Sequence, residues 1–357
     1  MASTTCLIPS NPDIAGIGVR ISIYVQAATA LVPAALKIIE DQLHENTGPK
    51  SQRTKFHKTV VNWENIKDIA TPNIVLGFAL LVSSVIQAHI YGLTVYHALI
   101  LLNLHIIIGF SVSPYFILSA NDGGNPENKE NLGGLHPAHM RIAQLHVVHL
   151  SCAAGFGLWL FATIKHFDHS DPDCTSSTVY YALGKKVIVD HPGFRDFWIV
   201  MYSFLVVPVV NLIFLLFVYF IILLVSVGFF LPIAFIVGVL GGCIGVKTQY
   251  MVMGGRLTFV FLAALTPGAL ILFLTEAMIK VNHVADGESQ WTFGQTIALF
   301  IALWPLWNVY KQTRETVKRI RAGIEAPETD DPESKTSEEA KNEKDQAGET
   351  TSATQKV

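Results

Sequence analysis

The chain is poor in charge. Asp, Glu, Lys and Arg make up 15% of its 357 residues, whereas soluble globular domains contain roughly 25%. Cysteine is scarce as well, and its four copies show no paired spacing, so neither a disulfide framework nor a cysteine-bound zinc site is supported. The opening stretch MASTTCLIPSNPDIAGIGVR lacks the basic region and apolar run of a cleavable signal. We expect the first apolar helix to direct the chain to its membrane.

The short motifs of common enzymes are missing too. GVLGGCIG lies in apolar sequence and lacks the Lys-Ser/Thr ending with which a phosphate-binding loop holds phosphate and metal. No serine-centred elbow, HExxH motif or Asp-rich prenyl-transferase motif is present. We therefore expect no nucleic-acid partner, no metal and no cofactor. Enzymatic activity is not favoured, although a histidine pair leaves oxidative chemistry open.

Apolar residues, in contrast, make up 51% of the chain and gather in long blocks. A helix needs about 20 such residues to cross a hydrocarbon core of about 30 Å. The blocks are 14–39, 71–91, 93–119, 138–167, 194–246 (long enough for two spans), 257–281 and 292–310. They predict an all-α, polytopic transmembrane helix bundle with about seven spans, within a range of six to eight, whose partner is the lipid bilayer.

Polar segments set the domain boundaries. Residues 1–13 are predicted to form an extramembrane N-terminus, and residues 14–321 a transmembrane domain with polar loops at 40–69, 120–137 and 168–193. Residues 322–357 are rich in Glu, Lys, Ser and Thr and contain no aromatic residue. Such a segment cannot bury enough apolar area to offset its chain entropy, so a disordered acidic and polar tail is predicted.

Orientation follows from lysine and arginine, which concentrate in short cytoplasmic loops. The loop 40–69 and the segment KQTRETVKRIR after the last block are the most basic, which places both in the cytoplasm and requires an even number of crossings between them. The blocks between them give seven. Either part of 194–246 is re-entrant, or one basic segment faces outside. We favour seven spans in total, with the N-terminus outside and the C-terminus inside.

The stretch LHPAHMRIAQLHVVHLSC places four histidines just before and inside an apolar block. A helix that begins near this point carries His146 and His149 on one flank, one or two turns inside the membrane. The preceding helices add His97 and His105, which could hold a haem with them. The alternatives are interior histidines bonded to a neighbouring helix and a proton- or ligand-coupled site. We predict that His146 and His149 face the interior and hold no metal, because no carboxylate lies near in sequence.

A second polar group lies in LTEAMIKVNHV, near the end of an apolar block. Glu276 and Lys280 are four residues apart in the favourable order and are expected to pair along one helix face. Asn282 and Gln295 are expected to supply uncharged donors near the helix end. The group is either an interfacial salt bridge at the membrane edge or a site where Glu276 accepts a cation or a proton.

Three motifs carry a family resemblance. NPDIAGIGVRISIYVQ (residues 11–26), TEAMIKVNHV (275–284) and WTFGQ (291–295) resemble those of a large group of uncharacterised multi-pass membrane proteins from filamentous and mushroom-forming fungi. Glu276, Asn282 and Gln295 match the recurring pattern, and Lys280 is less diagnostic. The resemblance implies an integral membrane protein of about seven helices and implies no substrate.

These observations favour a transporter or channel-like protein for a small solute or ion, because proline punctuates the spans and ionisable groups lie within them. A seven-helix, receptor-like sensor is the alternative, although the third span ends in SPYFILSANDGG without an Asp/Glu-Arg-Tyr triplet. A haem-binding transmembrane oxidoreductase is the third possibility. The candidate polar site comprises Glu276, Lys280, Asn282, Gln295, His146, His149, His97 and His105.

Overall fold

A computed structural model describes residues 7–33, 35–36, 63–122, 137–167, 177–182, 184–214, 216–218, 220–221, 224 and 266–325. The chain divides into two units, Met1–Thr316 and Val317–Val357. In the second unit the description ends at Glu325, so the tail predicted for 322–357 lies almost wholly outside the described residues. Most of the predicted loops 40–69 and 120–137 lies outside them as well.

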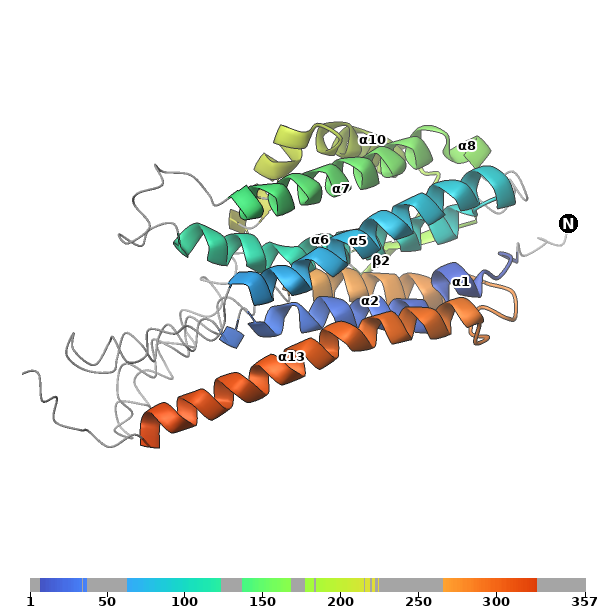
Figure 1. Cartoon of the computed structure of the whole chain (residues 1–357). Helices are drawn as coiled ribbons and strands as arrows, with labels where there is room; N and C mark the ends of the chain where they lie inside the picture. The colour runs from blue at the N-terminus through green and yellow to red at the C-terminus, as the bar shows by residue number, and fades with distance from the viewer. Residues whose placement is uncertain are drawn as a thin grey trace, which may run out of the picture. The chain divides into compact units, whose positions relative to one another are not determined.

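Helices make up most of the described chain (Figure 1). They are α1 (Pro12–Ala15), α2 (Ile17–Thr29), α5 (Trp63–Ile86) with its π-helical continuation η1 (Gln87–Tyr91), α6 (Val95–Asp122), α7 (Pro137–Ala162), α8 (Ile164–Phe167), α10 (Pro192–Leu205), a helix over 266–281 and α13 (Phe293–Glu325). Four described segments are long and apolar enough to cross a membrane: Pro12–Pro33, Ala70–Tyr91, Val95–Val112 and Met140–Ala162. A fifth is added if α10 and the helix Pro208–Val218, which are bent by 112°, form one broken span.

The prediction of an all-α chain is wrong in the polar loop 168–193. Val179–Ala182 (β1) and Lys185–Ile188 (β2) form an antiparallel hairpin in which Tyr180 pairs with Val187. Gly184 supplies the positive φ of 81° that the tight turn requires. β-Branched and aromatic residues favour such strands, but four-residue strands give too short a pattern to be recognised inside a polar loop.

Two helices extend beyond the apolar blocks that predicted them. α5 begins at Trp63, inside the predicted loop 40–69, and α13 runs for 33 residues, through the basic segment that follows the predicted span 292–310. Lys, Arg and Glu are good helix formers, so the helical backbone continues where the apolar pattern stops. An apolar block therefore marks the part of a helix suited to the membrane rather than the ends of the helix.

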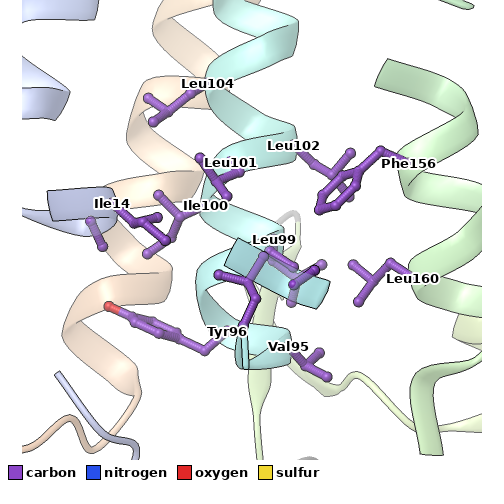
Figure 2. Packing of buried hydrophobic residues seen from close by; sticks show 14 of the residues in the cluster. Ile14, Val95, Tyr96, Leu99, Ile100, Leu101, Leu102, Leu104, Phe156 and Leu160 are labelled. Atoms are coloured by element: carbon purple, nitrogen blue, oxygen red, sulfur yellow. The ribbon is translucent and has the colours of Figure 1, made fainter. Parts of the chain in front are cut away.

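α6 lies at the centre of the described helices. α5, α6 and α7 pack pairwise against one another, α2 packs against α6, and α10 packs against α7. Figure 2 shows Phe156 and Leu160 of α7 facing α6, while Ile14 of α1 lies beside Ile100 on the opposite side of α6. α6 is buried on both sides, and its segment Val95–Val112 has the largest buried share of the four apolar segments.

One end of the first unit is closed by several short contacts, and we call it the capped end. α2, α6, α10 and α13 begin there, whereas α5, α7 and the helix 266–281 end there. The side chain of Gln295 joins the start of α13 to that of α2, Arg195 joins the start of α10 to the end of α7, and His89 at the end of α5 stacks on Trp159 of α7. Taken in chain order, these seven described helices therefore run alternately away from and toward the capped end.

Large apolar side chains cover the outer surface of several helices. They include Val75, Val82 and Ile90 on α5 and η1, Phe197, Val200 and Phe204 on α10, and Phe300, Trp304 and Trp307 on α13. Soluble monomers rarely expose contiguous apolar surface on this scale. The exposed rings and aliphatic chains are suited to contact with lipid, which supports the membrane location.

Candidate functional site

A buried ion pair joins the first long helix to the helix 266–281. The Arg20 guanidinium of α2 donates through Nη1 to Oε1 of Glu276, and the Tyr24 hydroxyl donates to the same oxygen at 3.0 Å. Arg20 is held in place by a second bond, from Nε to the carbonyl oxygen of Ala15 at 2.8 Å. The Arg20 side chain is 10% exposed and that of Glu276 is 33% exposed. The carboxylate is therefore the accessible partner of the pair.

The expected pairing of Glu276 with Lys280 is wrong. Lys280 is exposed, and the ion pair of Glu276 within the described chain is made with Arg20. A local i,i+4 pair along one helix face gains only a few tenths of a kcal/mol. The arginine, fixed one helix away and removed from water, is the stronger partner because the two charges neutralise each other in an apolar environment.

Gln295 does not approach Glu276 but clamps the N-terminal motif. Its Nε2 donates to the carbonyl oxygens of Pro12 (3.0 Å) and Gln290 (2.7 Å), and its Oε1 accepts from the backbone N–H of Gly18 (2.8 Å). A Cβ atom on Gly18 would lie 2.7 Å from the Cβ of Gln295. The glycine is therefore needed for the close approach of α2 and α13.

Hydrogen bonds hold the rest of the N-terminal segment against residues 283–292. The backbone of Ile8 bonds to His283 and Ala285 (2.9 and 2.8 Å), and the Thr292 hydroxyl donates to Asp13. The motifs of residues 11–26, 275–284 and 291–295, which lie at opposite ends of the sequence, thus form one structural cluster at the capped end.

Asn282 fixes the β-hairpin. Its Oδ1 accepts from the N–H of Val179 (2.9 Å), and its Nδ2 donates to the carbonyl oxygens of Val179 (2.8 Å) and Met278 (2.7 Å). The amide thus pairs with the edge of β1 as a neighbouring strand would. The Tyr180 hydroxyl donates to Oδ1 of Asn103 on α6 at 3.2 Å, and burial raises the pKa of Tyr180 to about 12.

His97 belongs to the capped end and lies apart from the other candidate histidines. Its Nδ1 shares a hydrogen bond with the Thr94 hydroxyl at 2.6 Å, and its Nε2 lies 3.2 Å from Oε1 of Glu288. Glu288 also accepts from the N–H of Asn11 at 2.7 Å. The carboxylate therefore links the start of α6 to the N-terminal segment.

His105, His146 and His149 gather between α5, α6 and α7. Nδ1 of His105 lies 3.2 Å from Nε2 of His149, at hydrogen-bonding distance. His105 is 1% exposed, His146 3% and His149 0%, so the prediction that His146 and His149 face the interior is confirmed. On α5, Gly77 lies against the His149 ring, and a Cβ there would overlap it.

The histidine geometry does not fit a haem between α6 and α7. His105 and His149 face each other as the haem hypothesis requires, but their nitrogens are in direct hydrogen-bond contact and leave no room for an iron and its macrocycle. Within the described ranges, no group of three or more His, Cys, Asp or Glu side chains has a geometry suited to a metal ion.

Comparison of the chain with known protein families, with curated proteins and with solved structures finds no match.

Sequence reasoning missed three residues of the polar centres, namely Arg20, Tyr24 and Glu288. A signal for Arg20 was present, because it interrupts the first apolar block and a charge inside such a block needs a partner. Glu288 had no such signal, since it lies in a polar connection whose path is set by tertiary contacts.

Proposed function

We propose that the protein is a transporter or channel-like membrane protein for a small solute or ion, with Arg20, Tyr24 and Glu276 as its binding centre. The observation that carries this proposal is the ion pair between α2 and the helix 266–281. A charge inside a spanning helix costs about 2.5 to 3.5 kcal/mol on insertion scales, and such groups usually mark a substrate or ion pathway.

The arrangement around the carboxylate allows a second occupant. Arg20 and Tyr24 both bond to Oε1 of Glu276. Within the described chain neither of them engages Oε2, and a third of the side chain is exposed. A cation or a proton taken up at Oε2 weakens the attraction of Glu276 to Arg20 and lets α2 separate from the helix 266–281. The contact between these two helices then has two states, as transport requires.

The alternating helices support a topology of seven crossings. α5, α6 and α7 each lead from one end to the other, the segment 192–281 starts and ends at the capped end, and α13 leads away from it. The segment 192–281 contributes an even number of crossings because of where it starts and ends. The number of crossings between the loop 40–69 and KQTRETVKRIR is then even. Both basic segments face the cytoplasm, and the capped end faces outside.

The bend of 112° between α10 and Pro208–Val218 supports one broken span, rather than two full spans, in 194–246. Two full spans there, followed by one at 257–281, would give three crossings between the start of α10 and the end of the helix 266–281. An odd number does not return the chain to the capped end. One broken span followed by the helix 266–281 does.

We also propose kinship with the fungal membrane-protein group. The motifs that carry the resemblance contact one another through Gln295, Gly18 and Asp13. Their joint occurrence therefore has a physical reason, because a change in one motif must be matched in the other.

The transport proposal is tested in vesicles reconstituted with the full-length protein. Sodium, potassium and proton gradients are imposed in turn, and the internal pH and membrane potential are followed with dyes. We expect the wild-type protein to dissipate at least one gradient faster than protein-free vesicles. No acceleration of any gradient would contradict the ionic form of the proposal.

The paired variant Arg20→Gln/Glu276→Gln separates a transport role from a structural one. It removes both charges together and leaves no unpaired buried ion. We expect it to insert and fold but to transport at least tenfold more slowly than wild type. Lys280→Gln, which removes an exposed charge one turn along the same helix, is the matched control and should transport normally. A folded double variant with full activity would make the ion pair purely structural.

A further inference from the structure

The His105–His149 contact is a second polar centre, separate from the Arg20–Glu276 pair. α6 begins at the capped end, and His105 lies ten residues further along it, about 15 Å at a rise of about 1.5 Å per residue. α7 ends at the capped end, and His149 lies about 20 Å before that end by the same measure. In a hydrocarbon core about 30 Å thick, the contact is near mid-depth.

The outer nitrogens of the pair, which are the two ring nitrogens outside the contact, lack hydrogen-bond partners within the described ranges. His105 Nε2 and His149 Nδ1 are both buried, and neither has a hydrogen-bond partner in the described part of the chain. A polar atom buried in this way costs free energy. His146, one turn before His149, is the further titratable side chain beside it, and α5 contributes the uncharged Asn73, Gly77 and Phe78. Among the described residues, no carboxylate or cation interacts with the rings of His105 and His149.

The inner contact contains a single proton. Two neutral imidazoles with facing nitrogens can bond only if one ring donates and the other accepts. When His105 Nδ1–H donates to His149 Nε2, the outer nitrogen of His105 is bare and that of His149 carries a proton. The reverse arrangement exchanges these roles, so the pair has two tautomeric states.

We propose that the His105–His149 pair passes protons across the α6–α7 interface and that the protein conducts protons through this site. A proton arrives on the bare Nε2 of His105, the Nδ1 proton moves to Nε2 of His149, and the proton on Nδ1 of His149 leaves. One proton has then moved from one outer nitrogen to the other, no electrons are transferred, and both rings have changed tautomer. The reverse sequence would carry the proton back, so a second proton passes in the same direction only after both rings have rotated to return their N–H groups to the starting direction.

Polar side chains continue along the interface on both sides of the pair. Toward the capped end, Asn103 of α6 bonds to Tyr180. Toward the opposite end, Ser111 of α6 accepts a hydrogen bond from Asn73 of α5 at 3.1 Å, and His146 lies one turn from His149. Apolar side chains alone would stop a proton at mid-depth. The hydroxyl, amide and imidazole groups provide donors and acceptors between Asn103 and Ser111, in the middle of α6.

The test uses vesicles that contain the full-length protein and a pH-sensitive dye. A potassium diffusion potential set by valinomycin drives proton entry, and the dye reports its rate. We expect the wild-type protein to raise proton entry above that of protein-free vesicles, and His105→Phe/His149→Phe to lower the protein-dependent rate at least tenfold. This double variant keeps two rings in place and removes the two unpaired nitrogens His105 Nε2 and His149 Nδ1, so it should fold. His89→Phe, a histidine stacked on Trp159 outside the interface, is the control and should conduct as wild type.

His149→Gln gives a second measurement that does not depend on the aromatic pair. Its amide can still bond to His105 but cannot pass a proton on, so proton entry should again fall at least tenfold in a protein with a normal melting temperature. Wild-type flux in either folded variant, or no protein-dependent flux in the wild type, would overturn the proposal. His105→Phe/His149→Phe should leave any sodium or potassium flux of the wild type unchanged, which distinguishes a failure of this site from a failure of the ion-pair site.

Discussion

At the scale of single residues, Gly18 and Gln295 show how little space separates α2 from α13. Gly18→Ala places a methyl group 2.7 Å from the Cβ of Gln295, so the two helices must separate. We expect a loss of about 1 to 3 kcal/mol, the usual cost of overpacking, seen as a lower melting temperature in detergent. Gly155→Ala in α7 is the matched control, because nothing lies within 4 Å of the added methyl group, and it should be neutral or slightly stabilising. Equal melting temperatures for the two variants would contradict the close approach.

The Arg20–Glu276 pair gives a second prediction at this scale. Glu276→Gln leaves the guanidinium buried without a counter-charge, which we expect to cost about 1 to 3 kcal/mol. Breaking a fully buried pair costs about 3 to 5 kcal/mol, and the lower figure reflects the exposed third of the Glu276 side chain. Adding Arg20→Gln should restore most of the lost stability. Thermal melts of the two variants and the wild type check this, and additive losses would contradict direct pairing.

At the scale of elements, the β-hairpin depends on Asn282. Asn282→Leu keeps the side-chain size but removes three hydrogen bonds, one of which holds the N–H of Val179. We expect faster amide exchange at Val179 and faster proteolysis of the hairpin, with the spanning helices unchanged. Lys186→Ala, an exposed position on β2, should leave both rates as in wild type. Unchanged exchange in Asn282→Leu would show that strand pairing alone holds the hairpin.

The same hairpin should respond to alkaline pH through Tyr180. Burial raises the pKa of this hydroxyl from about 10 to about 12. The folded state therefore holds the phenolic proton more tightly than the unfolded state. Its contribution is complete below pH 10 and is lost as the pH rises to about 12. The difference in unfolding free energy between wild type and Tyr180→Phe should shrink over this window, and a constant difference would contradict the assignment.

At the scale of the whole molecule, the alternating helices predict which segments share a side of the membrane. In a cysteine-free background, Ser289→Cys at the capped end should react with an impermeant thiol reagent from outside sealed cells. Arg314→Cys on α13 and a cysteine introduced at Ser51 should react only after the membrane is opened. Reaction of Ser289→Cys and Arg314→Cys from the same side would rule out the proposed topology.

The sequence predicts helices and buried faces well because both depend on local patterns. Periodicity places His146 and His149 on the interior flank of α7 without knowledge of any neighbour. It does not reveal that His105, rather than His97, opposes them, because that depends on how far α6 and α7 slide past each other. The i,i+4 spacing, which is visible in a sequence, favours Lys280 as the partner of Glu276. The true partner, Arg20, is 256 residues away, and nothing local joins the two.

The separation of Arg20 and Glu276 in the sequence affects how the protein folds during its synthesis. Arg20 enters the membrane early in synthesis, and its counter-charge is 256 residues from the exit of the ribosome at that moment. At about 5 to 20 residues per second, the arginine waits on the order of 10 to 50 seconds for Glu276. The contacts of Gln295 with Gly18 and of Thr292 with Asp13 form later still. The first helix can pack against α6 once that helix is made, but until Glu276 follows, its arginine needs either a position at the membrane surface or a temporary protein partner.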